Sequence, residues 1–521
     1  MKRTSGLLRN VFTVGSWTAL SRVLGFVREM LQSRLIGAGW EQSAFTFAFL
    51  IPNLTRRLFG EGALTSAFVP VFKEQVEAGR RDEALRLARA VSTMVALMLG
   101  AVVLAAMLGI TGALALGGDA FGERTGLILR LTRITLPYAV FICAAAFGMG
   151  VLNALGRFLE SAFTPCILNL VWIATLGSFV LVPGVEVRTR LYALCGAIVV
   201  AGALQLAFML WALRRRGFAL RPSRAGWRDE ATRLVWRNTL VAAVGAGAIQ
   251  LNAFVDQSLA QLASPWAAGV IGFADRLMEL PLGVVGIAFG TVLLPTFSGF
   301  FARGDGAGAR DALVSATRNM LFIMVPASVG LAVLAPDVVR LVYQGGRFDA
   351  EATLRVARAL RCYAAGLAVF GFNKAIVPWF HAQKDMRTPL RVSVRMVLAN
   401  LALNAAAVFG LPVEWRHVGI AFATVATSVG TCAWLLALAR RRNGPLGLGA
   451  LRGDLGQMLP AAAAMGLLLF SLRFFSARWF GSLGWAGSAI MLALLVAIGA
   501  GLYAFFIAGF KAYDRRRHAS R

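Results

Sequence analysis

The sequence is poor in cysteine and histidine. It has five cysteines, which lie singly inside apolar segments, and three histidines far apart along the chain. Neither residue shows the spacing of a zinc site or of a redox CxxC motif. A Gly-rich phosphate loop, an HExxH motif and a recognisable Ser/His/Asp arrangement are also missing. We therefore expect a protein that is not an enzyme and that holds no organic cofactor.

Charge is also scarce. Only 15% of the residues are charged, whereas 58% are hydrophobic and the mean hydropathy is +0.69. Soluble proteins average about 45–50% apolar and about 25% charged residues, so this composition indicates a polytopic membrane protein. The net charge of +28 comes mainly from arginines in short bursts between apolar runs. Because no basic stripe is interleaved with aromatic residues, we expect no nucleic-acid partner.

Apolar stretches recur along the whole chain. A transmembrane helix needs about 20 mostly apolar residues, and fourteen stretches approach or exceed that length. They are residues 8–33, 43–60, 90–118, 134–156, 161–185, 191–213, 238–263, 280–302, 317–336, 359–382, 391–412, 418–439, 455–472 and 479–510. The predicted fold class is therefore an all-α polytopic membrane protein with fourteen transmembrane helices.

The loops alternate in charge. Basic connections fall at 73–89, 214–233, 302–318, 381–391 and 440–454, and a basic tail follows at 511–521. The connections between them are short and poor in Lys and Arg, such as 262–269 and 411–417. The positive-inside rule then predicts that both termini are cytoplasmic. One predicted outside segment, 344–361, breaks the rule because it is as basic as some inside loops.

An internal repeat suggests two similar lobes. LRLTR at 129–133 matches LRVAR at 354–358, and Tyr138 and Pro70 have counterparts at the same offset of 225 residues. A repeat of six helices relates the lobes by a pseudo-twofold axis along the membrane normal, as in carriers that use alternating access. We predict an N-lobe at 1–215, a C-lobe at 216–442 and two C-terminal helices with a basic cytoplasmic tail at 443–521.

Arginines inside apolar stretches need a reason, because one at mid-bilayer costs about 2.5–3.5 kcal/mol on the insertion scale. The candidates are Arg22, Arg28, Arg56 and Arg276. They come from both lobes, and their like charges repel unless an anion lies among them. Guanidinium groups bind phosphate oxygens bidentately, so we predict a cavity for a phosphate or diphosphate headgroup. The alternative is that these arginines snorkel to the interface or form ion pairs within helices.

Acidic residues accompany these arginines. Glu29 lies seven residues after Arg22 on the same helix face, where the two side chains can pair. Glu61 follows Arg57 at the i,i+4 spacing that favours a helical ion pair. Glu279 follows Arg276 three residues later.

A second polar group suggests a cation site. Its members are Asp256, Asn400, Asn404 and Thr424, all in apolar stretches. A carboxylate with amide and hydroxyl oxygens can surround a small hard cation such as sodium. Hydrogen bonds between packed helices are the alternative explanation.

Four motifs resemble the MurJ (MviN) family of bacterial lipid II flippases, within the multidrug/oligosaccharidyl-lipid/polysaccharide exporter superfamily. They are SRVLGFVRE at 21–29, GAG at 37–39, PNLTRRLFGEGALTSAFVPVF at 52–72 and ADRLMELPLGVVGIAFGTVLLPTFS at 274–298. The resemblance extends over essentially the whole chain. One departure is Ser43, at a position that is often acidic in the family, where Glu41 is the nearby substitute.

The resemblance implies a function and a set of site residues. Substrate-binding roles would fall to Arg22, Arg28, Arg56, Arg276, Glu61 and Glu279, and a sodium site of some members would correspond to Asp256, Asn400, Asn404 and Thr424. The last two helices would hold the polyprenyl tail. The implied protein is an inner-membrane flippase of peptidoglycan and cell-wall biogenesis, with lipid II, membrane lipid and the cell-wall and division machinery as partners. The alternatives are a multidrug or other polysaccharide-lipid exporter, or a membrane-embedded enzyme.

Overall fold

The computed structural model describes residues 2–58, 64–117, 121–476 and 483–519. These residues are almost entirely helical, and the β-type pairing among them is an isolated bridge between Gly345 and Phe348. Contacts divide the chain into two compact units. Unit 1 comprises Met1–Gln257 and Gly345–Phe348, and unit 2 comprises Ser258–Gln344 and Asp349–Arg521. This division follows contacts, so the lobe boundaries expected from the repeat stay a prediction.

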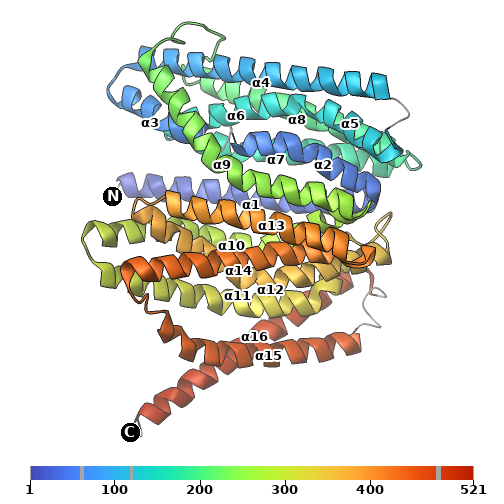
Figure 1. The fold of residues 1–521 in the computed structure, drawn as a ribbon, viewed down its shortest axis with the longest axis vertical. Coiled ribbons are helices and arrows are strands. Elements are labelled where there is room, and N and C mark those ends of the chain that lie inside the picture. Colours follow the sequence, from blue (N-terminus) through green and yellow to red (C-terminus); the bar gives the residue numbers. More distant parts are fainter. Residues whose placement is uncertain (1, 59–63, 118–120, 477–482, 520–521) are drawn as a thin grey trace. The chain divides into compact units, whose positions relative to one another are not determined.

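Unit 1 contains eight helices and most of a ninth (Figure 1). They are α1 (Lys2–Ile36), α2 (Trp40–Thr55), α3 (Leu64–Glu77), α4 (Arg81–Gly117), α5 (Glu123–Thr135), α6 (Pro137–Ala154), α7 (Leu159–Leu181), α8 (Val187–Arg214) and α9 (Glu230–Ala263). Proline at the first position of α6 lacks a backbone donor, so it separates α6 from α5.

Unit 2 holds the end of α9 and the later helices. They are α10 (Ala267–Ala302), α11 (Gly306–Tyr343), α12 (Ala350–Ala382), α13 (Arg387–Gly410), α14 (Val413–Asn443), the short η3 (Leu448–Ala450), α15 (Leu451–Ser476) and α16 (Gly484–Ala519). Each of the fourteen predicted stretches overlaps a helix of one of the two units. Ten helical stretches of the described residues are long and apolar enough to cross a membrane. The predicted all-α polytopic class is confirmed.

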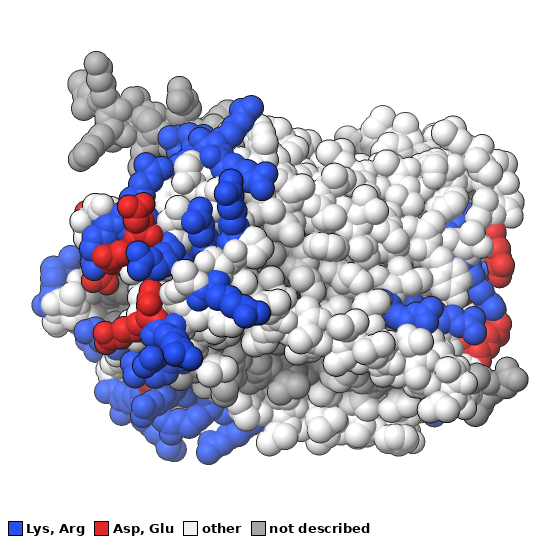
Figure 2. All heavy atoms as spheres, turned by 90° about the horizontal axis from the view of Figure 1, so that it is seen from above, with Lys and Arg blue, Asp and Glu red and all other residues white. Residues whose placement is uncertain are grey.

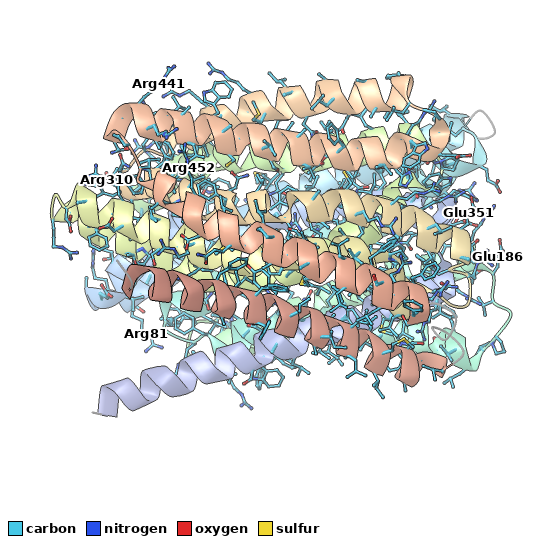
Figure 3. All side chains as sticks on the ribbon, turned by 90° about the horizontal axis from the view of Figure 1, so that it is seen from below. Arg81, Glu186, Arg310, Glu351, Arg441 and Arg452 are labelled. Atoms are coloured by element: carbon cyan, nitrogen blue, oxygen red, sulfur yellow. The ribbon has the colours of Figure 1, made fainter. Side chains whose placement is uncertain are left out.

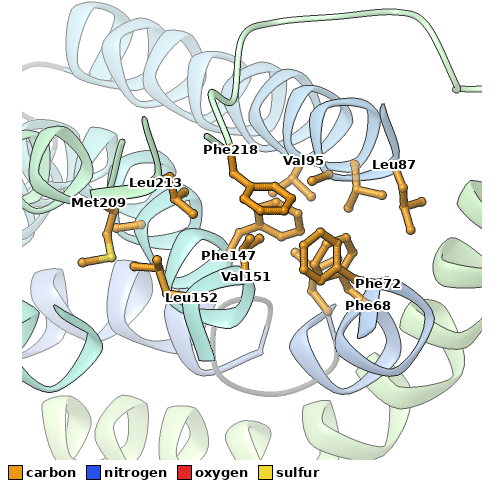
Figure 4. Close-up of a cluster of buried hydrophobic side chains, with 14 of the residues drawn as sticks. Phe68, Phe72, Leu87, Val95, Phe147, Val151, Leu152, Met209, Leu213 and Phe218 are labelled. Atoms are coloured by element: carbon orange, nitrogen blue, oxygen red, sulfur yellow. The ribbon is translucent and has the colours of Figure 1, made fainter. Parts of the chain in front are cut away.

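Aromatic side chains build one core of unit 1 (Figure 4). Phe68 and Phe72 of α3 stack at 5.2 Å between ring centroids, and Phe147 of α6 lies 4.5 Å from Phe68. Phe218, which follows α8, closes the same cluster against Phe72 at 5.7 Å. These rings are buried, and contacts of this geometry add about 0.5–1.5 kcal/mol per pair beyond the burial of their area. The cluster therefore fixes α3 against α6.

The outer surfaces are apolar, as a lipid environment requires. Phe409, Phe474 and Phe505 keep 78%, 74% and 73% of their surface exposed. On the face drawn in Figure 2, charged side chains gather toward the helix ends and leave an uncharged surface between them. Exposed apolar patches of this extent mark contact with a membrane or another protein, so the multi-pass interpretation agrees with both hydropathy and surface.

The segment Gly345–Phe348 covers the C-terminal end of α1 and belongs to unit 1, although its sequence neighbours belong to unit 2. The amide of Arg347 donates to the carbonyl oxygen of Arg34 at 2.9 Å. Gly37 and Gly346 have positive φ values of 86° and 56°. A Cβ atom on Gly346 would lie 2.3 Å from the carbonyl oxygen of Arg34. The two backbones can approach this closely only because that position is glycine.

The loop between α12 and α13 is held by an acidic residue. Asp385 precedes α13 and accepts from the backbone amide of Thr388 in its first turn at 2.9 Å, and it pairs with Arg442 at the end of α14. Burial alone raises the pKa of the Asp385 carboxyl, but the hydrogen bonds from Thr388 and the Arg442 guanidinium outweigh it. The net result is a pKa well below the usual range.

Candidate functional site

Arg28 of α1 is the predicted site residue with the best-defined surroundings. Its Nη2 atom lies 2.6 Å from Oε1 of Glu29, and its Nη1 atom donates to Oδ1 of Asn169 on α7 at 3.0 Å. The guanidinium carbon lies 4.6 Å from the centre of the Trp172 ring, also on α7. The side chains of Arg28 and Glu29 keep only 14% and 17% of their surface exposed. The arginine is therefore held within a polar group packed between two helices.

Asn169 connects the two helices that form this group. Its Oδ1 atom accepts from Arg28, and its Nδ2 atom donates to the carbonyl oxygen of Ser21 on α1 at 3.0 Å. The residue is 6% exposed. Neither Asn169 nor Trp172 was among the residues predicted for the site. An amide inside the apolar stretch 161–185 was the signal that could have identified Asn169, because buried polar groups in lipid usually have a partner.

Arg22 occupies a different environment from Arg28. It lies on α1 six residues earlier, and its side chain is exposed. Glu29 forms an ion pair with Arg28. The pairing of Glu29 with Arg22 stays a prediction, and the two arginines differ in exposure.

Arg56 lies where α2 ends. Both its Nε and Nη2 atoms donate to Oδ1 of Asn53, at 3.2 Å and 3.0 Å. The side chain is half-buried. Its guanidinium is therefore oriented by the preceding turn of the chain. Glu61 lies outside the described residues, and so does its predicted pair with Arg57.

Arg276 and Glu279 lie on α10 in unit 2. Nη1 of Arg276 is 3.2 Å from Oε2 of Glu279, and the side chains are 45% and 48% exposed. An exposed pair of this kind contributes little, about 0–1 kcal/mol, so the carboxylate can give way to another anion at little cost. The gathering of Arg276 with the three arginines of unit 1 stays a prediction.

The predicted cation ligands form two groups in the described chain. Asp256 of α9, in unit 1, accepts from Nδ2 of Asn252 at 3.2 Å. In unit 2, buried Asn404 donates to Oδ1 of buried Asn400 at 2.8 Å, both on α13. Thr424 of α14 donates to the carbonyl oxygen of Ile420 at 3.2 Å.

The orientation of these amides bears on the sodium hypothesis. Oδ1 of Asn400 keeps a second lone pair, and the hydroxyl of Thr424 keeps its acceptor capacity, so both can ligate a cation. The Nδ2 atom of Asn400, in contrast, is buried and has no hydrogen-bond partner among the described residues. That donor suits an acceptor atom rather than a cation. The sodium site therefore stays a prediction.

Ser43 fills the position that is often acidic in the resembling family. It is fully buried, and its hydroxyl donates to the carbonyl oxygen of Gly39 at 3.3 Å. Glu41, the predicted substitute, is half-buried in the first turn of α2. Serine carries no charge, so Ser43 cannot make the salt bridge that an acidic residue at this position could make.

Comparison with known proteins gives a consistent result. The family model described as lipid II flippase MurJ matches residues 32–486. A probable lipid II flippase MurJ from Rhizobium tropici is 32% identical, covering 99% of this chain and 97% of that protein. The lipid II flippase MurJ of Burkholderia cenocepacia is also 32% identical, over 84% of each chain.

Solved structures share the fold. A structure of lipid II flippase MurJ in an inward closed conformation superposes with a TM-score of 0.75 at 21% identity, covering 98% of this chain and 99% of that one. An inward-facing multidrug resistance MATE family transporter of the MOP superfamily gives 0.65 at 17% identity, over 84% of this chain and 98% of that one. At these identities the structural match speaks for the fold alone.

Proposed function

Because this chain belongs to the MurJ family of lipid II flippases, we propose that it moves lipid II from the cytoplasmic to the periplasmic leaflet of the bacterial inner membrane. The family and the fold are those of a membrane transporter rather than an enzyme. Lipid II joins a disaccharide-peptide to an undecaprenyl tail through a diphosphate. A carrier for it needs groups that bind the diphosphate and release it again.

The observation that best supports this proposal is the setting of Arg28. Its guanidinium lies against Trp172, is largely shielded from solvent and is oriented by Glu29 and Asn169. Its Nε atom is buried and has no hydrogen-bond partner among the described residues. A preorganised guanidinium with an unused donor suits a phosphate oxygen, which accepts charge-assisted hydrogen bonds.

Arg28 can exchange Glu29 for the diphosphate of the cargo, which makes the binding of the cargo reversible. A diphosphate carries more charge than the single carboxylate of Glu29, so it competes well for Arg28 when it enters the site. Arg22 and Arg56, with Arg276 from unit 2, would complete the anion site. When the cargo leaves, Glu29 pairs with Arg28 again, so no bare charge has to persist in a region of low dielectric constant.

Movement of cargo would follow alternating access. Binding of the anion removes repulsion among the arginines and favours closure around the headgroup, and opening to the other leaflet releases it. The membrane potential, or a sodium ion at Asp256, Asn400, Asn404 and Thr424, would return the empty carrier. The undecaprenyl tail would stay in contact with α15 and α16. Cell-wall and division proteins remain proposed partners.

Complementation of a flippase-depleted bacterium tests the proposal, with lipid II on the outer leaflet as the measured quantity. Loss of two charge-assisted hydrogen bonds in Arg28→Ala should lower the transport rate about tenfold or more. Arg28→Lys keeps the charge but loses the planar fork, so it should transport at an intermediate rate. Arg452→Gln, which changes an exposed arginine at the start of α15, is the matched control. Normal export by Arg28→Ala would refute the headgroup role.

The similarity to a MATE transporter keeps a multidrug exporter as a second candidate. A site rich in arginine repels cationic drugs, which argues against it. The same cells discriminate between the two functions. Depletion of a multidrug exporter leaves lipid II on the outer leaflet unchanged, whereas depletion of a flippase makes lipid II accumulate on the inner leaflet.

A further inference from the structure

A second group of arginines lies in unit 2 and includes none of the site residues used above. It surrounds Asp337 near the end of α11, and we call it the Asp337 cluster. Its members are Asp337, Arg340, Arg358, Arg361 and Arg473. They come from α11, α12 and α15, and within this unit α12 and α15 each pack against α11.

All four arginines have contacts within this unit. Nε of Arg340 donates to Oε1 of Gln344 at 3.3 Å, and the guanidinium carbon of Arg358 lies 5.0 Å from the centre of the Trp415 ring. Nε of Arg473 donates to Oδ2 of Asp337, whose residue is only 4% exposed. Nε of Arg361 donates to the carbonyl oxygen of Ala332 on α11 at 3.2 Å. The charges of Asp337 and Arg473 both act on Arg361, so the three side chains are electrostatic neighbours.

The charge within this cluster is unbalanced. The cluster holds four arginines and one carboxylate, and that carboxylate is buried against Arg473. Arg340 and Arg361 are exposed, so their guanidinium groups can be reached from outside the protein. Gathered cations lower the free energy of a bound anion by Coulomb attraction and, in the case of arginine, by bidentate hydrogen bonds. The cluster therefore favours an anion with several acceptor oxygens.

Two members of the cluster, Arg358 and Arg361, lie in the basic segment 344–361, which breaks the positive-inside rule. Within unit 2, Arg310, Arg441 and Arg452 lie toward one end of the helices, and Glu351 lies at the opposite end (Figure 3). Glu351 opens α12, the helix that carries Arg358 and Arg361 two and three turns later. By the same rule the densely basic end is cytoplasmic, so the Asp337 cluster belongs to the outer leaflet.

The surface beside the cluster is apolar and open. Phe474 and Phe475 directly follow Arg473 on α15, and they are 74% and 68% exposed. Phe470, one turn earlier, is 59% exposed. A ligand that satisfies both features carries an anionic head for the arginines and hydrocarbon for the phenylalanine rings. That combination describes an anionic lipid rather than a soluble anion.

We propose that the Asp337 cluster binds the phosphate group of an anionic lipid in the outer leaflet, with its acyl chains along Phe470 and Phe474. Arg340 and Arg361 bind the phosphate oxygens, and Arg358 adds positive charge. Arg473 has a different role, because it neutralises buried Asp337 and joins α15 to α11. The lipid bound here is distinct from the cargo, so the site operates whether or not the proposed transport function is correct.

Native mass spectrometry of the purified full-length protein tests this site. The protein is equilibrated with phosphatidylglycerol or with zwitterionic phosphatidylcholine, and retained lipid is counted. Replacement of both exposed arginines, in Arg340→Gln/Arg361→Gln, should lower phosphatidylglycerol retention about fivefold, which corresponds to about 1 kcal/mol. Retention of phosphatidylcholine should not change. Arg441→Gln, at the opposite end of the unit, is the control and should retain phosphatidylglycerol normally.

Two further measurements keep the result interpretable. Arg340→Lys/Arg361→Lys preserves the positive charge and should recover most of the phosphatidylglycerol retention. It therefore reports whether a loss of retention in the glutamine variant reflects weaker binding or misfolding. Inorganic phosphate is added as a competitor to separate a lipid site from a site for the free anion. Displacement of phosphatidylglycerol only by high phosphate concentrations supports the lipid. Equal retention in the glutamine variant and the unsubstituted protein, or complete displacement by low phosphate, would overturn the proposal.

Discussion

Replacement of Gly346 by alanine should detach the segment Gly345–Phe348 from the end of α1. Gly346 has a φ of 56°, in the left-handed region, and its Cβ would lie 2.3 Å from the carbonyl oxygen of Arg34. That oxygen belongs to the backbone of a helix, so no side-chain rotation can relieve the overlap. The hydrogen bond from the amide of Arg347 to the same oxygen has to lengthen or break.

The size of the effect follows from two contributions. Left-handed backbone costs a residue with a Cβ about 1 kcal/mol, and loss of the hydrogen bond costs about 1 kcal/mol more. The sum, about 2 kcal/mol, corresponds to about a thirtyfold increase in the open population of this segment. Gly304 supplies the control, because its φ is 70° and a Cβ there would meet nothing within 4 Å.

Hydrogen exchange followed by mass spectrometry measures this opening directly. In Gly346→Ala, the peptide containing Arg347 should exchange about thirtyfold faster than in the unsubstituted protein, under conditions where exchange reports the open population. In Gly304→Ala, the same peptide should exchange at its normal rate. If both variants protect the Arg347 amide equally, then the close approach at Arg34 does not hold this segment and the reasoning is wrong.

Three other predictions use single contacts. Asn169→Ala should lower transport even though Arg28 is retained, because the Arg28 guanidinium loses a positioning partner. Asn169→Asp keeps an acceptor for Arg28, so it should restore transport in the complementation assay. Asp385 has a lowered pKa, so its ionised carboxylate stabilises the folded protein fully above about pH 4 and less as the pH falls toward the folded-state pKa. Between pH 5 and pH 3, the thermal unfolding temperature of Asp385→Asn should therefore change less with pH than that of the unsubstituted protein. Arg473→Ala should destabilise the protein by about 3–5 kcal/mol, since it leaves Asp337 buried without its partner; the double change Asp337→Leu/Arg473→Leu should recover most of the loss in a thermal unfolding assay.

The helices were predictable because one local property determines them. Each predicted stretch is apolar over its own length, and lipid leaves such a segment no alternative to satisfying its backbone hydrogen bonds internally. Arg28 could also be recognised as unusual from the sequence, because the free-energy cost of a charge in an apolar stretch depends on the residues beside it. Family motifs at 52–72 and 274–298 then connected these residues with a function.

The surroundings of the arginines were not predictable from the sequence. Asn169 is 141 residues from Arg28, and no periodicity within α1 or α7 specifies which face of one helix meets the other. Glu29 illustrates the same limit, since helix spacing pointed to Arg22 and did not indicate the ion pair with the adjacent Arg28. In the sequence, the Asp337 cluster could be recognised only through Arg358 and Arg361, which belong to the basic segment 344–361 on the predicted outer side. Its interpretation depends on Arg473 of α15, which is 136 residues from Asp337.

The return of Gly345–Phe348 to unit 1 has a consequence for biosynthesis. The ribosome completes α1 early, but the segment that donates to its last turn is made only after residues 258–344 have emerged. During that interval the carbonyl oxygen of Arg34 lacks the amide of Arg347. Unit 1 therefore cannot reach its final structure as an independent translation product. A split gene that ends at Gln257 would yield an N-terminal fragment with an unfinished helix end, and only co-expression of the remaining chain would complete it.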